Sequence, residues 1–426
     1  MDGQPSAVVH PVVRPPQPAP QRPTQSQPKL SHAFAARVLT LLMGLQPLTT
    51  DLMLPALPAL AADLRAPMAP VQLTMAALIL GFGLAQLVWG PVADRVGRRP
   101  VLLLGLALYA LASVGAVLAD QVMAVVAWRA VQGAAMSAAV VCGRAMVRDL
   151  YEPREGAMVM ARALTGLGFV AIVSPALGGW LVAAWGWRAA LVAMGLTGAA
   201  LTVFMAIALP ETAQHRRPEA TQLRPLLRQM AATLGHPGFR AWAGLVACSY
   251  GGLFIFLAGS GFVLIQVLGL APGWAGLVMS SCSLSYMVGT LWCRRWIPRF
   301  GLVGAVQRGA CFTLAACAAL ITLAITDSRS WLAVMAPTWI YAMGHGIHMP
   351  CGQVGAVAPF PKAAGLASAL AGFVTAASAF CIGLWLGWSM DGTVRPFALG
   401  MAGAAAMTAL VAWTLVRRDG EPLASA

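Results

Sequence analysis

The chain alternates long apolar runs with short charged segments. Residues 71–89 and 101–119 contain no charged side chain. A helix of about 20 such residues crosses the hydrocarbon core of a bilayer. Only helices and closed barrels satisfy their backbone hydrogen bonds there, and the ten-residue alternation of a barrel is absent. With 59% hydrophobic and 10% charged residues, the sequence predicts an all-α membrane protein.

Apolar runs of the required length predict about twelve transmembrane helices. Their expected limits are 35–59, 70–90, 100–119, 122–143, 158–182, 189–209, 240–265, 273–293, 303–325, 332–356, 364–388 and 395–416. The widest polar gap separates six spans from six. The domain prediction is a disordered Pro/Gln-rich cytoplasmic tail, a first six-helix half, a cytoplasmic linker, a second half and a short tail, at 1–33, 34–210, 211–238, 239–417 and 418–426.

The basic residues predict the orientation, because cytoplasmic loops carry an excess of Lys and Arg. Of the 28 basic residues, 23 fall in the tails and in alternate loops, 4 fall in the opposite loops, and Arg129 lies within a span. Both termini are therefore expected in the cytoplasm. Positive charge spread over membrane loops also argues against nucleic acid as a partner, despite the net charge of +14.

A compact charged segment, residues 90–100, joins the second and third spans. Its candidate gating and structural residues are Gly90, Asp94, Arg95, Gly97 and Arg98. The segment resembles the loop between helices 2 and 3 of the major facilitator superfamily, and residues 289–301 repeat it faintly without the aspartate.

Two further arginines lie at the cytoplasmic end of span 4. Arg144 and Arg148 are four residues apart, so they share one helix face. We interpret them as structural ion-pair partners, with Asp94 as a possible acid, rather than as groups that bind substrate.

Asp51 is the acidic residue that we expect at membrane depth, within span 1; the other acids fall in loops, tails or span ends. A charge there costs roughly 2.5–3.5 kcal/mol on insertion scales and normally faces a cavity. We interpret Asp51 as the proton-coupling carboxylate. The alternative, which Pro55 and Pro58 make conceivable, is that span 1 ends early and Asp51 lies in the interface.

Arg129 in span 4 is the matching cation. An arginine in a span needs a carboxylate, a carbonyl or water. It either tunes a nearby carboxylate or gates protons, or else it extends to the outer interface. Whether it touches Asp51 is open.

Span 10 contains His345 and His348, three residues apart and next to a proline. Three roles stay open: packing or backbone hydrogen bonds at the kink, cavity lining, and a proton relay. The spacing offers too few ligands for a metal site. No phosphate-binding G-x-x-x-x-G-K-[ST] loop is present, so we expect no cofactor and no ATP motor.

Span 5 has Pro175, Gly178 and Gly179 in a glycine-rich stretch, where small residues allow close helix packing. This stretch resembles the antiporter motif of the superfamily. Together the segments resemble its bicyclomycin/chloramphenicol-resistance (Bcr/CflA) type of drug:proton antiporter. The resemblance implies two pseudo-symmetric six-helix halves, a monomer in a bacterial inner membrane, and efflux of amphipathic drugs such as phenicols or bicyclomycin-like compounds against protons.

The substrate cavity is expected between the halves, near the membrane midplane. Its candidate residues are Met53, Gln132, His345, His348 and Gln353. Met53 departs from the tyrosine usual in the family. The alternative function is proton-coupled or facilitated transport of a small metabolite. A membrane enzyme or receptor would need a soluble domain or a catalytic cluster within a span, and the sequence has neither.

Overall fold

The computed structural model describes residues 31–213 and 221–421. Every regular element in these two stretches is a helix. The predicted tail 1–33 lies outside the described residues except for its last three, and so does most of the tail 418–426.

The helices before the central linker are α1 (His32–Asp51), α2 (Leu57–Asp63), α3 (Met68–Val96), α4 (Arg98–Val117), α5 (Val122–Leu150), α6 (Pro153–Trp185) and α7 (Trp187–Ala208). The linker contains α8 (Leu223–Gly235). After it come α9 (Pro237–Gly261), α10 (Pro272–Thr326), α11 (Trp331–Val357), α12 (Ala364–Ser389), α13 (Arg395–Trp413) and α14 (Leu415–Asp419). Short 3₁₀ or π turns are η1 (Leu54–Ala56), η3 (Phe262–Val267) and η4 (Pro361–Ala363).

Ten of the described helical segments are long and apolar enough to cross a membrane. The longest, α10, counts once but has two arms that meet at Gly301. Another helix, α11, is 27 residues long, but its tryptophans, histidines and prolines make it less apolar. With both of these counted, the described chain has the twelve long segments that the sequence predicts.

Two glycines form the sharp turns between neighbouring long helices. Gly97, between α3 and α4, has φ 120°, and Gly301, inside α10, has φ 68°. Residues that have a side chain rarely adopt these backbone angles, whereas glycine adopts them freely. Each glycine follows an arginine by two residues, Arg95 and Arg299, so the faint repeat in the sequence corresponds to a repeated turn.

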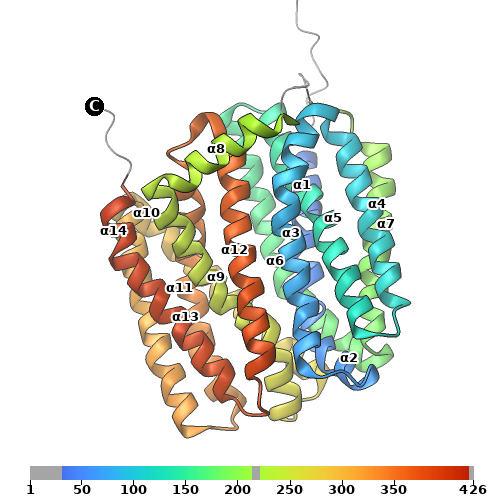
Figure 1. The fold of residues 1–426 in the computed structure, drawn as a ribbon, viewed down its shortest axis with the longest axis vertical. Helices are drawn as coiled ribbons and strands as arrows, with labels where there is room; N and C mark the ends of the chain where they lie inside the picture. The colour runs from blue at the N-terminus through green and yellow to red at the C-terminus, as the bar shows by residue number, and fades with distance from the viewer. Residues whose placement is uncertain (1–30, 214–220, 422–426) are drawn as a thin grey trace, which may run out of the picture.

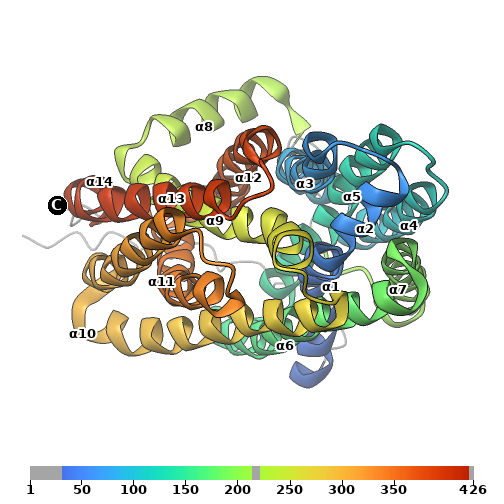
Figure 2. The same ribbon diagram turned by 90° about the horizontal axis from the view of Figure 1, so that it is seen from below.

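The helices form two groups that lie side by side. In Figure 1 the helices up to α7 (blue to green) occupy one side, and α9 to α14 (yellow to red) occupy the other. Seen from below in Figure 2, α3 faces α12 and α6 runs along α10. The contacts between the groups therefore come mainly from these two helix pairs and from η1 against α9 and α10.

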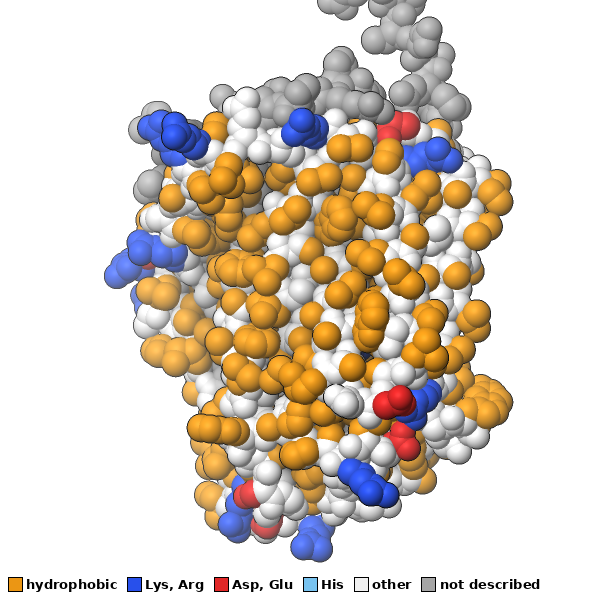
Figure 3. Space-filling model, turned by 45° about the vertical axis from the view of Figure 1, so that its right-hand side comes forward, with side chains coloured by type: hydrophobic (Ala, Val, Ile, Leu, Met, Phe, Trp, Pro, Cys, Tyr) orange, Lys and Arg blue, Asp and Glu red, His pale blue; other side chains and the backbone are white. Residues whose placement is uncertain are grey.

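The surface matches a protein that spans a bilayer. Figure 3 shows an apolar band across the middle of the bundle on this face, with charged side chains gathered toward its two ends.

At one end α8 lies across the bundle, at the top in Figure 1. The sequence analysis assigned this region only to a linker. Its leucines Leu223 and Leu227 are exposed among arginines, which is the composition of a helix that lies in a membrane interface.

Candidate functional site

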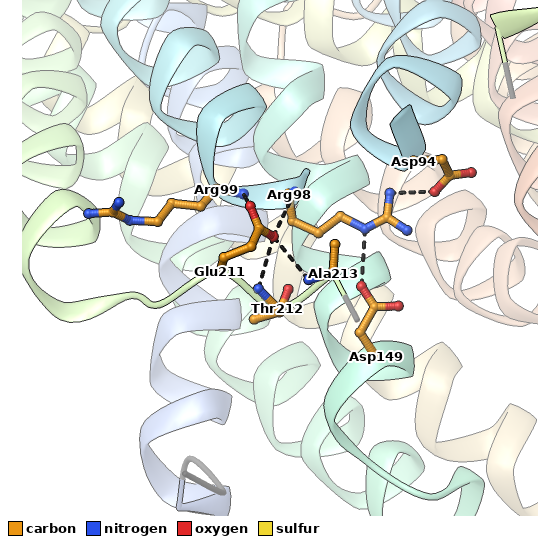
Figure 4. A network of polar contacts seen from close by, with 7 residues as sticks. All are labelled: Asp94, Arg98, Arg99, Asp149, Glu211, Thr212 and Ala213. Carbon is orange, nitrogen blue, oxygen red and sulfur yellow. Dashed lines mark hydrogen bonds and ion pairs between the residues drawn. The ribbon is translucent and has the colours of Figure 1, made fainter. Parts of the chain in front are cut away.

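The charged segment after α3 ties three helices together. Arg98, at the start of α4, forms an ion pair with Asp94 at the end of α3, and its Nε lies 3.1 Å from Asp149 Oδ2 at the end of α5 (Figure 4). Arg95 donates to Thr221 across to the linker, at 2.8 Å. Gly97 provides the turn described above, and Gly90 has open space on its side-chain side. The segment therefore fixes the relative positions of α3, α4 and α5.

Glu211 completes this cluster, although the sequence analysis gave it no role. Its carboxylate accepts hydrogen bonds from the backbone N–H groups of Arg98 and Arg99, at 2.9 and 3.3 Å. It also accepts from Thr212 and Ala213, each at 2.9 Å (Figure 4). The first N–H groups of a helix lack partners within the helix and favour negative charge. Glu211 therefore caps α4 from the end of α7.

The variant Glu211→Gln should lose about 1–2 kcal/mol of stability, because the amide nitrogen cannot accept the hydrogen bond that the second carboxylate oxygen accepts from Arg99. Thermal unfolding of the detergent-purified protein measures this loss. The control is Glu155→Gln, since Glu155 is half exposed and lies 3.7 Å from His32 in a weak pair. Equal melting temperatures for the two variants would contradict the capping role.

Asp51 lies deep in the molecule, at the point where the first span breaks. The helix α1 ends at Asp51, Pro55 and Pro58 open the next two turns, and the chain continues in α2 to Asp63. Asp63 binds Arg188 and Trp187 at the surface. Asp51 precedes Asp63 by twelve residues, which is about 18 Å of helix. Asp51 is therefore enclosed by protein and separated from the surface residue Asp63 by η1 and α2, while its depth in a membrane stays a prediction.

No cation pairs with Asp51 within the described residues. Its side chain is 8% exposed, and Oδ1 accepts a hydrogen bond from Thr50 Oγ1 at 2.7 Å. The tyrosine hydroxyl of Tyr250 and the thiol of Cys282, both from the other helix group, lie within electrostatic range. No other Asp or Glu is buried among the residues that the structure describes. Asp51 therefore faces the boundary between the two helix groups.

Arg129 is fully buried, and its guanidinium does not reach Asp51. Nη1 donates to Gln132 Oε1 at 2.6 Å, and Nη2 donates to the backbone oxygen of Thr49 at 3.2 Å. Gln132 in turn donates to Ser113 at 2.7 Å. Arg129 thus holds the end of α1 two residues before Asp51, through a carbonyl rather than a carboxylate. Arg129 can therefore affect Asp51 only indirectly, because it fixes the position of the end of α1.

A cavity lies between the two helix groups, on the side of Asp51 that is nearer to α8. Its volume is about 100 Å³. The first group contributes Gln46, Ile79, Phe82, Gln86 and Arg144 to its walls. The second contributes Val246, Tyr250, Met349, Gln353, Ser368, Ala371, Gly372, Thr375 and Ala376.

Only Gln353 of the five predicted cavity residues lines this cavity. Met53 is fully buried in the break of the first span, and Gln132 is held by Arg129. His345 lies 2.8 Å from Ser249 Oγ, and His348 Nε2 lies 3.3 Å from the Val306 oxygen. Both histidines thus make polar contacts inside the second group. Gln46 and Gln86 were missed, although an amide within an apolar span is a usable signal.

Arg144 and Arg148 also lie elsewhere than we interpreted from the sequence. Among the described ion pairs, Asp94 binds Arg98 and neither of these arginines. Arg144 points into the cavity and donates to Ser368 of α12 at 3.4 Å. Arg148 lies beside Gly365, also of α12. Both therefore reach across to the second helix group.

The glycine-rich stretch of α6 packs against two partners. Gly178 lies against the backbone oxygen of Leu52, immediately after Asp51. Gly179 lies against the backbone of Pro272, and the Pro175 oxygen lies against Gly276, both in α10. A side chain at Gly178 or Gly179 would overlap this backbone. The stretch therefore joins the break in the first span to the second helix group.

Comparison with known proteins gives the family. The model of the Major Facilitator Superfamily matches residues 39–384. Multidrug resistance protein D of Escherichia coli is 31% identical over 79% of this chain and 84% of its own. A chloramphenicol resistance protein of Pseudomonas aeruginosa is 29% identical over 80% of each chain. Among solved structures, a D-xylose–proton symporter matches 92% of this chain and 100% of its own, with TM-score 0.70 and 17% identity. The chain belongs to the major facilitator superfamily of membrane transporters, and its named relatives include drug-resistance proteins.

Proposed function

We propose that the protein exports small amphipathic compounds, such as phenicols or bicyclomycin-like drugs, across a bacterial inner membrane in exchange for protons. One observation carries the proposal: the single buried acid of the described chain lies just beyond the inner end of a cavity between the two helix groups. Such a carboxyl group can take up or release a proton in response to an occupant of the cavity.

The short distance between Asp51 and the cavity supports coupling between solute binding and proton binding. Gln46 lines the cavity and precedes Asp51 on α1 by five residues, or about 7.5 Å of helix. Tyr250 lines the cavity and is also within electrostatic range of Asp51. A solute bound against Tyr250 and Gln46 changes the water around the carboxyl group. Binding of solute and binding of a proton then influence each other.

The packing supports alternating access between two halves, residues 34–210 and 239–417. On the side of Asp51 away from α8, the groups touch through backbone at Gly179, Gly261 and Gly276. On the α8 side they enclose the cavity. Such a molecule is closed at one end and accessible from the other. Rocking of the halves would close the accessible end and open the closed one. Asp51 would take up a proton while the cavity opens to the outside and release it while the cavity opens to the cytoplasm.

The orientation in this proposal follows the basic residues. The end with α8 carries Arg224 and Arg228, and Arg95, Arg99 and Arg148 lie near it. Cytoplasmic segments are enriched in such residues. The cavity then opens toward the cytoplasm, where an exporter collects its solute.

The second candidate is proton-coupled or facilitated transport of a small metabolite. The similar D-xylose–proton symporter establishes the shared fold at 17% identity, and nothing about solute. The names of the drug-resistance relatives and the apolar cavity walls Ile79, Phe82 and Met349 favour amphipathic compounds.

Inside-out vesicles that contain the protein test the proposal. Their interior is acidified, a pH-sensitive dye reports protons, and phenicols and other amphipathic compounds are added in turn. We expect drug-dependent release of protons from the vesicles. If no compound releases protons while the protein is present in the membrane, export by proton exchange fails. An uptake screen with metabolites would then follow.

A further inference from the structure

The charge of the cavity between the helix groups indicates the class of solute. Arg144 is the one charged side chain among the residues that line it, and no acid lines it. Asp51 lies beyond its inner end, 8% exposed. The acids Asp94 and Asp149 at this end pair with Arg98 and do not line the cavity.

No carboxylate compensates the charge of Arg144 among the described residues. Its one hydrogen bond is to Ser368 Oγ, and at 3.4 Å this bond is long. Arg148, which is an electrostatic neighbour of Arg144 on the same helix, carries the same sign. An arginine enclosed in a protein ordinarily pairs with an acid. No described acid pairs with Arg144, so a solute in the cavity can supply the partner.

The remaining polar groups in the wall supply further hydrogen-bond donors. The amides of Gln46, Gln86 and Gln353 offer N–H groups, and Tyr250 offers a hydroxyl group. Ser368 and Thr375 add two more hydroxyl groups, and the rest of the wall is apolar. One polar side and one apolar side suit a compound with an acceptor group at one end and an aromatic or alkyl body at the other.

Building on the proposed exporter, we infer that the cavity selects anionic and neutral amphipathic compounds that place a carboxylate or other acceptor group on Arg144, and that it rejects amphipathic cations. The guanidinium can bind a carboxylate through two parallel hydrogen bonds. A cationic compound would instead meet Arg144, with Arg148 behind it, and no acid in the cavity wall. Arg129 contributes to neither effect, because it lies fifteen residues earlier on α5, about 22 Å along the helix.

Three compounds with one skeleton test the inference: 4-phenylbutyrate, 4-phenylbutanol and 4-phenylbutylamine. Binding to the purified protein in an uncharged detergent at pH 7 is followed by thermal shift or calorimetry. We expect affinity to fall in that order, with the acid at least about tenfold tighter than the amine. Arg144→Gln should remove this difference, and Arg144→Lys should keep part of it.

The control variant is Arg228→Gln, which removes an exposed arginine from α8 and should leave the order unchanged. Equal or tighter binding of the amine would overturn the inference, and so would an unchanged order in Arg144→Gln. The assay needs no proton gradient, so Asp51→Asn protein should show the same order. Selective binding without proton-coupled transport would therefore refute the proposed function and leave this inference standing.

Discussion

Replacement of Asp51 by asparagine should reduce drug-driven proton release to the background of empty vesicles while the protein stays folded. Asparagine has nearly the same shape as the protonated aspartic acid, and its oxygen can still accept the hydrogen bond from Thr50. Because an amide does not titrate, the variant can bind a solute but cannot exchange a proton for it. Drug resistance of cells and proton release from inside-out vesicles both measure the effect.

The matched control is Asp391→Asn. Asp391 is an exposed acid in the loop between α12 and α13, where it accepts hydrogen bonds from Thr393. We expect this variant to transport as the wild type does. Exchange of labelled drug across vesicles without a pH gradient should persist in Asp51→Asn, because that exchange needs only binding and rocking. Proton-coupled efflux that survives in Asp51→Asn would remove Asp51 from the coupling mechanism.

The number and order of the helices could be predicted because each span must be apolar along its length. The sequence also singled out Asp51, since a single acid in an apolar run stands out, and the structure buries it. The boundary at Gly301 was less predictable. Arg294, Arg295 and Arg299 indicated a loop, but the chain stays helical through them and turns at the glycine.

Side-chain partners could not be predicted, because they depend on which helices become neighbours. The four-residue spacing of Arg144 and Arg148 predicts a common face, but not that this face meets α12. For Arg129 the sequence left a carboxylate, a carbonyl or water open as partners, and the packing of α1 beside α5 decides for the carbonyl of Thr49. His345 likewise finds its partner, Ser249, 96 residues away in the sequence.

Two alanine substitutions in one helix should have opposite effects. Gly178→Ala places a methyl group on the backbone oxygen of Leu52, where neither backbone can yield by a change of rotamer. We expect a loss of about 1–3 kcal/mol, as for overpacked cores. Gly168→Ala, ten residues earlier in α6, adds its methyl group in open space, with nothing within 4 Å. Alanine favours helix over glycine by about 0.5–1 kcal/mol, so this variant should be as stable as the wild type or more stable.

We expect Gly178→Ala to impair transport more severely than it impairs folding. Leu52 directly follows Asp51, and Gly178 lies in the helix that also touches α10 through Gly179 and Pro175. A methyl group at Gly178 therefore moves the end of α1 relative to α6 and α10, and it shifts the carboxyl group from its place beside the cavity. Thermal unfolding and drug-driven proton release, measured on Gly178→Ala and Gly168→Ala together, separate the two effects. Normal transport in a folded Gly178→Ala protein would mean that coupling tolerates displacement of Asp51, because the contact leaves no other way to fit the added methyl group.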